Sequence, residues 1–464
     1  MNDNEYYTMD DWWRCNYLFR PRNLSLRSRL YYVTIFVSVA VVLILVLRET
    51  DRHKLQQLDN RHRNVLVGTS PTRNKIHHTS QHQQPSIILY WTKFFGTNDF
   101  EVGLGSKPFA SCTIGADDVN ASSCCLTTTD RGLLNDSDAV IFHGRDLHVE
   151  DLPPPGWRRP HQMFVFFLLE SPVHTDLEFL QRPVFRNYFN RTMTYRRDSD
   201  VVELHAYGRL RCIDPSSPSC LQFPRYGINA DSASVLGVIE KHPAADSAAV
   251  VLSDMNNVTI SSSKNRTVAW FVSNCNSNSQ RESVVRRLSQ FIAVDIYGKC
   301  GNGSNQHSCP NKFECDQMLS RHYRFYLSFE NSLCPDYITE KLYRPLAHDT
   351  VPVVYGGSDY SLYLPAGSYV NARDFENPEA LANHLKKLMA NDTLYASYFQ
   401  WRSQYVVDAA PLDGWCHLCR LLQLMMLRDP LANEEKTILD VAAWWSGQTT
   451  NQTCSSPPKS LIIV

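Results

Sequence analysis

The sequence lacks the features of a nucleic-acid binder, a repeat protein or a zinc module. Its 46 Lys and Arg residues nearly balance 47 Asp and Glu residues, and the formal net charge of −1 gives no basic field for nucleic acid. It contains no internal repeat of solenoid period. Cys416 and Cys419 have the spacing of half a zinc site, but Cys309 and Cys315 make a poor second half. Disulfide bonds are therefore the favoured use of these cysteines.

One apolar run, residues 30–47, is long enough to cross a membrane. It contains eighteen residues without a charge, and at about 1.5 Å per residue a helix of this length roughly spans the hydrocarbon of a bilayer. A cleaved signal peptide is the alternative, but residues 47–49 offer no small-residue cleavage site. We expect a retained signal anchor after a cytoplasmic tail, residues 1–29. Arginine and lysine residues flank the run in equal number on both sides, so the positive-inside rule does not orient it.

The part of the chain after this run has the marks of an oxidising lumen. It holds thirteen of the 14 cysteines, and because thirteen is odd, at least one thiol is free or pairs with another chain. The sequence does not give the connectivity. Eight N-glycosylation acceptors of the form Asn-x-Ser/Thr also follow the run: Asn120, Asn135, Asn190, Asn257, Asn265, Asn302, Asn391 and Asn451. We therefore expect a single-pass type II membrane protein whose catalytic part is luminal.

The luminal part divides by composition. Residues 48–84 are polar and cannot bury a core, so they predict a stem. Short apolar runs that end in polar residues fall in two sets, within residues 85–250 and within residues 251–430, and a tail of residues 431–464 follows. This pattern predicts an α/β fold with two Rossmann-like domains facing a cleft. Residues 208–260, rich in Pro, Ser, Ala and Asp, lie between the sets.

Residues 324–357 predict a β-α-β unit, with strands at 324–329 and 350–355 and a helix over 337–348. Ligands of open parallel sheets bind beyond the carboxyl ends of the strands, which places Glu330 and Asn331 at the rim of the sheet.

Glu340 and Lys341 fall near the start of this helix. A cation there opposes the helix dipole unless an anion lies nearby, and a diphosphate would be such an anion. The alternative is that Lys341 is a solvated surface lysine with Glu340 as its neighbour.

Two further polar residues follow predicted strands. Glu170 comes directly after the apolar run 163–169, and because partial burial raises the pKa of a carboxyl group, this position suits a general base. The alternative is that Glu170 caps the loop and that His174 is a surface residue. Arg281 follows the strand 267–273 and can bind two phosphate oxygens. Its alternative is a helix-surface arginine in a patch with its neighbours Arg286 and Arg287.

Two Asp-Ser-Asp triplets, residues 136–138 and 198–200, invite a metal interpretation. The motif is too short to be specific. Asp136 belongs to the sequon of Asn135, and Asp198 follows two arginines with which it can pair. We therefore predict no metal site.

The segments FYLSFENS, DYITEKLY and VPVVYGG resemble the signature of the α1,3-fucosyltransferases, and ESPVHT and YRRDSD resemble the acceptor-side motifs of that family, in the same order. The similarity covers residues 86–426, and the chain is identified as an insect-type Golgi member of glycosyltransferase family 10. The resemblance implies a GT-B type fold in which the C-terminal domain holds GDP-fucose and the N-terminal domain holds the acceptor.

The resemblance also implies roles for residues that match the motifs. Glu170 is the base that deprotonates the acceptor hydroxyl, and Lys341 and Arg281 hold the diphosphate. Asn331, Tyr337 and Glu340 contact the nucleotide and fucose, and the acceptor-side candidates are His174, Tyr195 and Arg196. The implied reaction is a single displacement that inverts the anomeric carbon of GDP-fucose, with N-acetylglucosamine in a glycan as acceptor. It needs no cofactor and no metal. The alternative is a non-catalytic luminal glycan-binding paralogue.

Two segments depart from the family pattern. Cys334 lies inside the link between FENS and DYITEK, where it suggests a tether to Cys275 or Cys300. Residues 208–260 align with no recognised part of the family, so the sequence does not specify which glycan is the acceptor.

Overall fold

The computed structural model describes residues 84–110, 112–114, 119–120, 124–202, 207–214, 264–301, 306–308, 311–408, 413–427 and 437–463. All of them belong to the compact unit His82–Val464. The predicted tail and anchor, nearly all of the stem, and most of residues 208–260 lie outside the described residues. Within the described ranges, no helix has the length and apolar character needed to span a bilayer.

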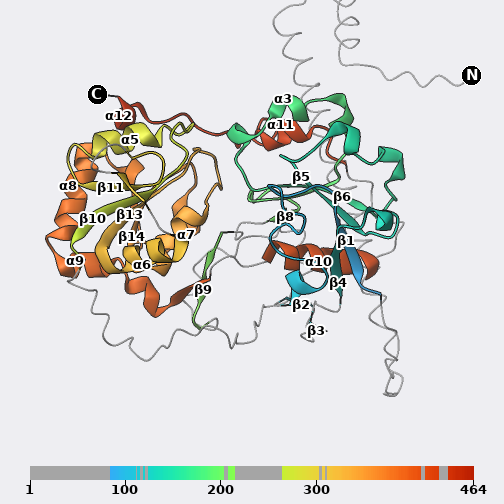
Figure 1. Ribbon diagram of the computed structural model, residues 1–464, viewed down its shortest axis with the longest axis horizontal. Coiled ribbons are helices and arrows are strands. Elements are labelled where there is room, and N and C mark those ends of the chain that lie inside the picture. Colours follow the sequence, from blue (N-terminus) through green and yellow to red (C-terminus); the bar gives the residue numbers. More distant parts are fainter. Residues whose placement is uncertain are drawn as a thin grey trace, which may run out of the picture. The chain divides into compact units, whose positions relative to one another are not determined.

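The first sheet has six parallel strands in the order β4-β1-β5-β6-β7-β8 (Figure 1). Every residue of β5 and β6 is buried, as expected for central strands covered on both faces. Val140 of β5 pairs with Phe164 of β6, which fixes the register of the centre. The strands are β1 Ser86–Tyr90, β4 Cys125–Thr128, β5 Ala139–His143, β6 Met163–Leu168, β7 Arg191–Thr194 and β8 Val201–Val202.

The second sheet is also parallel and six-stranded, in the order β12-β11-β10-β13-β14-β15. Its strands are β10 Arg266–Phe271, β11 Val294–Tyr297, β12 Gln306–His307, β13 Tyr323–Phe329, β14 Val351–Tyr355 and β15 Val370–Asn371. Its helices, drawn around it in Figure 1, are α5 Arg281–Leu288, α6 Lys312–His322, α7 Glu340–Ala347, α8 Pro378–Met389 and α9 Asp392–Ser397. The predicted α/β fold with parallel sheets is confirmed.

The predicted β-α-β unit is present as β13, α7 and β14, but its helix begins three residues later than the predicted position 337. The carboxylate of Glu330 accepts hydrogen bonds from the backbone and hydroxyl of Thr339, at 2.9 and 3.0 Å. These bonds hold residues 330–339 in a loop, which we call the donor loop.

Smaller elements complete the described fold. β9, Arg209–Cys212, pairs antiparallel with β16, Tyr405–Asp408, and β2, Thr113–Ile114, pairs antiparallel with β3, Val119–Asn120. The helix α3, Leu177–Leu180, lies between β6 and β7 in the chain.

The helix α10, Asp413–Leu427, packs on the first sheet. Its side chains of Trp415, Leu418 and Leu422 join the core that contains Ile88 and Ile141. Disulfides Cys112–Cys416 and Cys125–Cys419 hold the helix there, which confirms the prediction of disulfides over zinc for this pair. The division at residues 250 and 430 had assigned this helix to the second domain. Its apolar face and cysteines instead find their partners in the first sheet.

The predicted C-terminal tail is a packed segment, residues 437–463, which we call the C-terminal strap. Its helix α11, Val441–Trp445, lies beside α3, and its helix α12, Lys459–Ile462, lies beside α5 (Figure 1). Between them, Cys454 forms a disulfide with Cys334. The suggested tether of Cys334 to Cys275 or Cys300 is wrong, because those two cysteines pair with each other.

Candidate active site

The candidate base Glu170 follows β6, and its half-buried side chain lies at the carboxyl edge of the first sheet. The next residue, Ser171, is buried, and its hydroxyl lies 2.7 Å from the hydroxyl of Ser332 in the donor loop. The carboxyl end of β6 therefore meets the segment that follows β13. This contact brings Glu170 close to the loop whose residues are predicted to bind the sugar donor.

Charged side chains from the start of the donor loop and from the start of α7 lie close together. Lys341 Nζ lies 3.4 Å from a carboxylate oxygen of Glu330, 3.2 Å from one of Glu340 and 2.8 Å from Thr339 Oγ1. Its side chain is only 19% exposed, so the interpretation of Lys341 as a solvated surface lysine is wrong. Desolvation lowers the pKa of Lys341, but the charges of Glu330 and Glu340 outweigh it, and the net shift is upward. The positive charge of Lys341 at the start of α7 is therefore compensated by two carboxylates of the protein, those of Glu330 and Glu340.

Glu330 is not at the rim of the sheet, as its position after a strand suggested, but is 1% exposed. It stays buried because Thr339 and Lys341 satisfy both carboxylate oxygens. Burial raises the pKa of Glu330, and the nearby Lys341 charge opposes that rise. Asn331 is half-buried, and its side-chain oxygen accepts a hydrogen bond from Ser332 at 3.0 Å.

Arg281 begins α5 and is 4% exposed, so it is not a helix-surface arginine. Its guanidinium donates to the backbone oxygen of Phe329 at 2.7 Å and to that of Asn274 at 3.3 Å. Phe329 is the last residue of β13, and Asn274 lies in the segment that follows β10. The charge of Arg281 is close enough to lower the pKa of Lys341 in opposition to the carboxylates. The two predicted diphosphate cations thus lie at the same edge of the second sheet.

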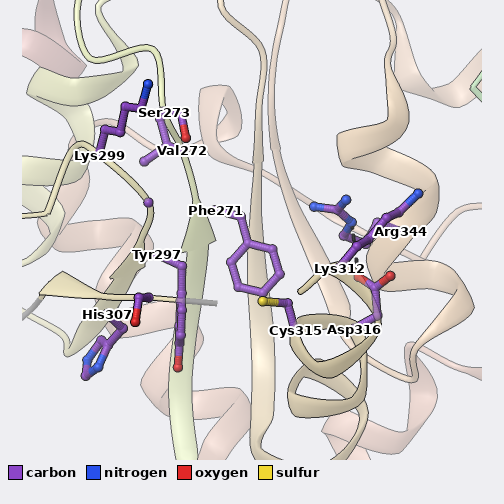
Figure 2. Close-up of a pocket in the computed structure, with 12 residues that line it drawn as sticks. Phe271, Val272, Ser273, Tyr297, Lys299, His307, Lys312, Cys315, Asp316 and Arg344 are labelled. Atoms are coloured by element: carbon purple, nitrogen blue, oxygen red, sulfur yellow. Dashed lines mark ion pairs between the residues drawn. The ribbon is translucent and has the colours of Figure 1, made fainter. Parts of the chain in front are cut away.

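A cavity of about 870 Å³ opens at the carboxyl ends of β10 and β11. Phe271 and Tyr297 form its aromatic wall, with ring centroids 5.0 Å apart. Figure 2 shows Lys299 on one side of these rings and Arg344 and Asp316, an ion pair at 3.2 Å, on the other. Arg344 lies one turn after Lys341 on α7. The cavity therefore joins an aromatic wall to a rim that carries the charged side chains of Lys299, Arg344 and Asp316.

The motif YRRDSD has a different role from the one expected. Tyr195 is buried and packs on Tyr337, with ring centroids 5.0 Å apart, and Tyr337 is itself 1% exposed. Arg196 pairs with Asp198 and donates to the C-terminal strap. Because the five donors of its guanidinium are all engaged within the protein, Arg196 has none left for an acceptor sugar. The internal pairing proposed for Asp198 is confirmed.

His174 ends the short helix Pro172–His174, four residues after Glu170. Its side chain is half-buried, and its Nε2 atom has no hydrogen-bond partner among the residues that the structure describes. An acceptor contact of His174 stays a prediction.

The remaining polar motifs are structural where they are described. Asp138 accepts a hydrogen bond from the backbone of Ile87 at 2.9 Å, and Asp200 accepts one from that of Thr192 at 2.9 Å. In the described ranges, no three His, Cys, Asp or Glu side chains gather as a metal site.

The sequons differ in accessibility. Asn135, Asn265, Asn391 and Asn451 are exposed, whereas Asn190 is 7% exposed. The Asn190 amide accepts from the backbone of Phe164 and donates to that of Gln162, at 2.8 and 2.9 Å. Glycosylation of Asn190 is therefore incompatible with this fold. Asn257 and Asn302 lie outside the described residues, and the side chain of Asn120 is not described.

Sequence reasoning missed Tyr207, which precedes β9. Burial raises the pKa of Tyr207, and the charges of Glu340, Glu170 and Glu330 raise it further, so carboxylates that follow strands of both sheets act on this hydroxyl. No local pattern signals this position, because Tyr207 lies outside the predicted strands and helices and precedes only the short strand β9. The sequence indicated Glu330 only as a residue at the rim of the sheet. A buried carboxylate whose oxygens are both hydrogen-bonded is a stronger indication of a functional site.

Both halves of the described chain match models of one family. Residues 83–207 match "Fucosyltransferase, N-terminal", and residues 261–444 match "Glycosyltransferase family 10 (fucosyltransferase) C-term". These matches define the protein as a glycosyltransferase. Segment 208–260 lies between the two matched ranges.

Two relatives are similar over most of their lengths. Alpha-(1,3)-fucosyltransferase C of Drosophila melanogaster is 35% identical over 386 residues, which cover 80% of this chain and 82% of that protein. Human 4-galactosyl-N-acetylglucosaminide 3-alpha-L-fucosyltransferase 9 is 34% identical over 374 residues, covering 76% and 86%. The chain belongs to the α1,3-fucosyltransferases of glycosyltransferase family 10. A solved alpha1,3-fucosyltransferase structure aligns with 79% of this chain and 97% of its own, at 16% identity and a TM-score of 0.45.

Proposed function

We propose that this enzyme transfers L-fucose from GDP-β-L-fucose, with inversion, in α1,3 linkage to N-acetylglucosamine of glycoprotein or glycolipid glycans. The observation that carries the proposal is the contact between Ser171 and Ser332 at 2.7 Å. It brings the candidate base Glu170 beside the loop that leads to Lys341. The names of the relatives, which are 3-α-fucosyltransferases, support the same linkage.

The donor would occupy the edge of the second sheet. The nucleoside fits the cavity beside Phe271 and Tyr297, whose rim carries Lys299 and Arg344. The diphosphate would then reach Lys341 and the region of Arg281. Glu340 is 48% exposed and can turn away from Lys341 when the diphosphate arrives. Asn331 and Glu340 would then contact the nucleotide and fucose.

The proposed reaction is a single displacement. Glu170 takes the proton of the acceptor hydroxyl while the acceptor oxygen attacks the anomeric carbon of fucose. The bond from that carbon to the diphosphate breaks, and its electron pair leaves with GDP. The cations of Lys341 and Arg281 stabilise the negative charge that develops on the diphosphate, a contribution that is commonly the largest in such reactions. The mechanism uses no metal and no cofactor beyond the donor.

We also propose that the protein is a type II membrane protein of the Golgi, anchored by residues 30–47. The disulfides of the described fold support an oxidising compartment.

The test is an assay of the purified full-length chain with GDP-fucose against a panel of acceptors: core chitobiose, antennae, glycolipids and protein. GDP-mannose and UDP-galactose serve as donor controls, and NMR of the product gives the linkage and the anomeric configuration. Glycan binding without transfer to any acceptor would favour the non-catalytic paralogue and contradict the proposal.

A further inference from the structure

Polar contacts attach the donor loop to residues that follow β6 and β7 of the first sheet. Ser332 contacts Ser171, and the carboxylate of Asp336 accepts from the Nε of Arg197 at 2.8 Å. Asp336 is 5% exposed and has a positive φ of 59°, so its backbone is held in a conformation that costs free energy unless its surroundings fix it. The loop is therefore held in one conformation by contacts from outside it.

The C-terminal strap supplies the one covalent attachment of this loop in the described structure. Cys334 is 1% exposed and bonded to Cys454. Next to this disulfide, the backbone N–H of Ser455 donates to the backbone oxygen of Leu333 at 2.8 Å. Gly357, just after β14, packs so closely that a Cβ there would lie 2.3 Å from the carbonyl carbon of Leu333. The centre of the loop is thus held by contacts with both the strap and the segment that follows β14.

The strap is in turn held by the residue that precedes Arg197. The guanidinium of Arg196 donates to the backbone oxygens of Trp444 and Trp445 at 2.6 and 3.0 Å, and to Thr450 Oγ1 at 2.7 Å. Trp445 packs on Tyr195 with ring centroids 5.4 Å apart, and Tyr195 packs on Tyr337 of the donor loop. The strap and the donor loop therefore rest on the same three residues, 195–197, which directly follow β7 of the first sheet.

We propose that Cys454, through its disulfide to Cys334, is a positioning residue that holds the donor loop in register with Glu170. This role rests on the proposed function, since it concerns alignment of the donor with the base. Arg281 and the aromatic wall of the cavity lie outside the donor loop, so GDP retains these partners when the disulfide is absent. Alignment of acceptor, base and anomeric carbon matters in the transition state, where a displacement of about 1 Å can cost on the order of a hundredfold in rate.

The experiment replaces both cysteines, as Cys334→Ser with Cys454→Ser in the full-length chain, so that no new thiol is left to mispair. We expect kcat for fucose transfer to fall at least about tenfold while KM for GDP-fucose and the Kd for GDP change less than about threefold. The matched control is Cys112→Ser with Cys416→Ser, which removes the disulfide of α10. We expect the control to lower Tm and to keep kcat. Full kcat in the folded Cys334/Cys454 variant, or an equal fall of kcat in the control, would overturn the positioning role.

A second measurement covers the case in which the double variant fails to fold. Wild-type protein is reduced in graded steps, opened cysteines are alkylated and mapped by mass spectrometry, and transfer and GDP affinity are measured on the same samples. We expect transfer to fall in proportion to alkylation of Cys454 with GDP affinity preserved. Transfer at the wild-type rate by folded molecules alkylated at Cys454 overturns the proposal. Wild-type protein without fucose transfer would instead overturn the proposed function itself.

Discussion

The hydroxyl of Ser171 lies 2.7 Å from that of Ser332, and each serine directly follows a predicted functional residue, Glu170 in one case and Asn331 in the other. The two serines are 161 positions apart in the chain, and both are buried. A single hydrogen bond of this kind contributes about 1 kcal/mol to stability, so its main consequence is geometric. It sets the candidate base against the loop that leads to the candidate diphosphate cation.

Replacement of Glu170 by Gln tests the base. The amide keeps the shape of the side chain but cannot take the proton of the acceptor hydroxyl, so we expect fucose transfer to be abolished. GDP affinity, measured by calorimetry, is expected to stay nearly unchanged because the base acts on the acceptor. Glu178→Gln, an exposed glutamate on α3, is the control and is expected to keep full activity. Normal transfer by Glu170→Gln would remove the assignment.

Replacement of Lys341 by Ala tests the diphosphate role. The change removes a cation from the leaving group and leaves the buried Glu330 without its charge partner, so both donor affinity and turnover are expected to fall. Loss of one such donor typically costs on the order of a hundredfold in rate. Lys387→Ala on the exposed face of α8 is the control. An unchanged Kd for GDP-fucose in the Lys341 variant would mean that the diphosphate lies elsewhere.

The strands, the β-α-β unit and the convergence of Glu170, Arg281 and Lys341 at strand ends could be predicted, because parallel strands are continuous apolar runs and their carboxyl ends share an edge. The disulfide partner of Cys334 and the packing of α10 could not be predicted from the sequence. Cys454 lies 120 residues from Cys334, and Cys416 lies 304 residues from Cys112. Pairing over such distances depends on tertiary packing and leaves no local periodicity. The role of Arg196 was hidden for the same reason, since its acceptors in the strap are about 250 positions away.

Chelation separates the proposed mechanism from a metal-dependent one. Both acidic triplets have structural partners in the fold, through Asp138 in one and Asp198 and Asp200 in the other. We expect substantial fucose transfer to remain in excess EDTA, measured with the same donor and acceptor. Complete loss in EDTA with recovery on adding Mn²⁺ or Mg²⁺ would support a divalent cation on the diphosphate instead.

Lys264, just before β10, predicts a pH dependence of stability. Its ammonium is buried among the backbone oxygens of Leu319, Tyr323 and Asp349, and burial lowers its pKa from 10.5 to about 8 although the Asp349 charge opposes this. The unfolded chain then binds a proton between pH 8 and 10.5 that the folded protein does not. The stabilising contribution of Lys264 is therefore present above the unfolded pKa and is lost as the pH falls through the folded one.

The measurement for Lys264 is urea unfolding between these pH values, compared with Lys264→Met. We expect the free energy of unfolding of the wild type, relative to the variant, to rise by about 3 kcal/mol across this range. Lys312→Met removes an exposed lysine and is expected to show no such slope against the wild type. Equal slopes for wild type and Lys264→Met would show that Lys264 has an ordinary pKa in the fold.

The sequon at Asn190 is predicted to stay unmodified although its sequence is a valid acceptor. Its amide is buried between the backbone groups of Phe164 and Gln162 at the starts of β6 and β7, where a glycan on Nδ2 cannot be accommodated without displacing these groups. Enzymatic deglycosylation in water enriched in oxygen-18 converts each glycosylated Asn to a labelled Asp, and peptide mapping is expected to find the label at exposed acceptors such as Asn391 and not at Asn190. Asn190→Ala is expected to lower the free energy of unfolding by about 1–3 kcal/mol, because two buried backbone groups lose their partners. Asn391→Gln, whose side chain is exposed, should remove a glycan with a smaller effect on stability. Detection of a glycan on Asn190 of the folded, active enzyme would contradict this arrangement of β6 and β7.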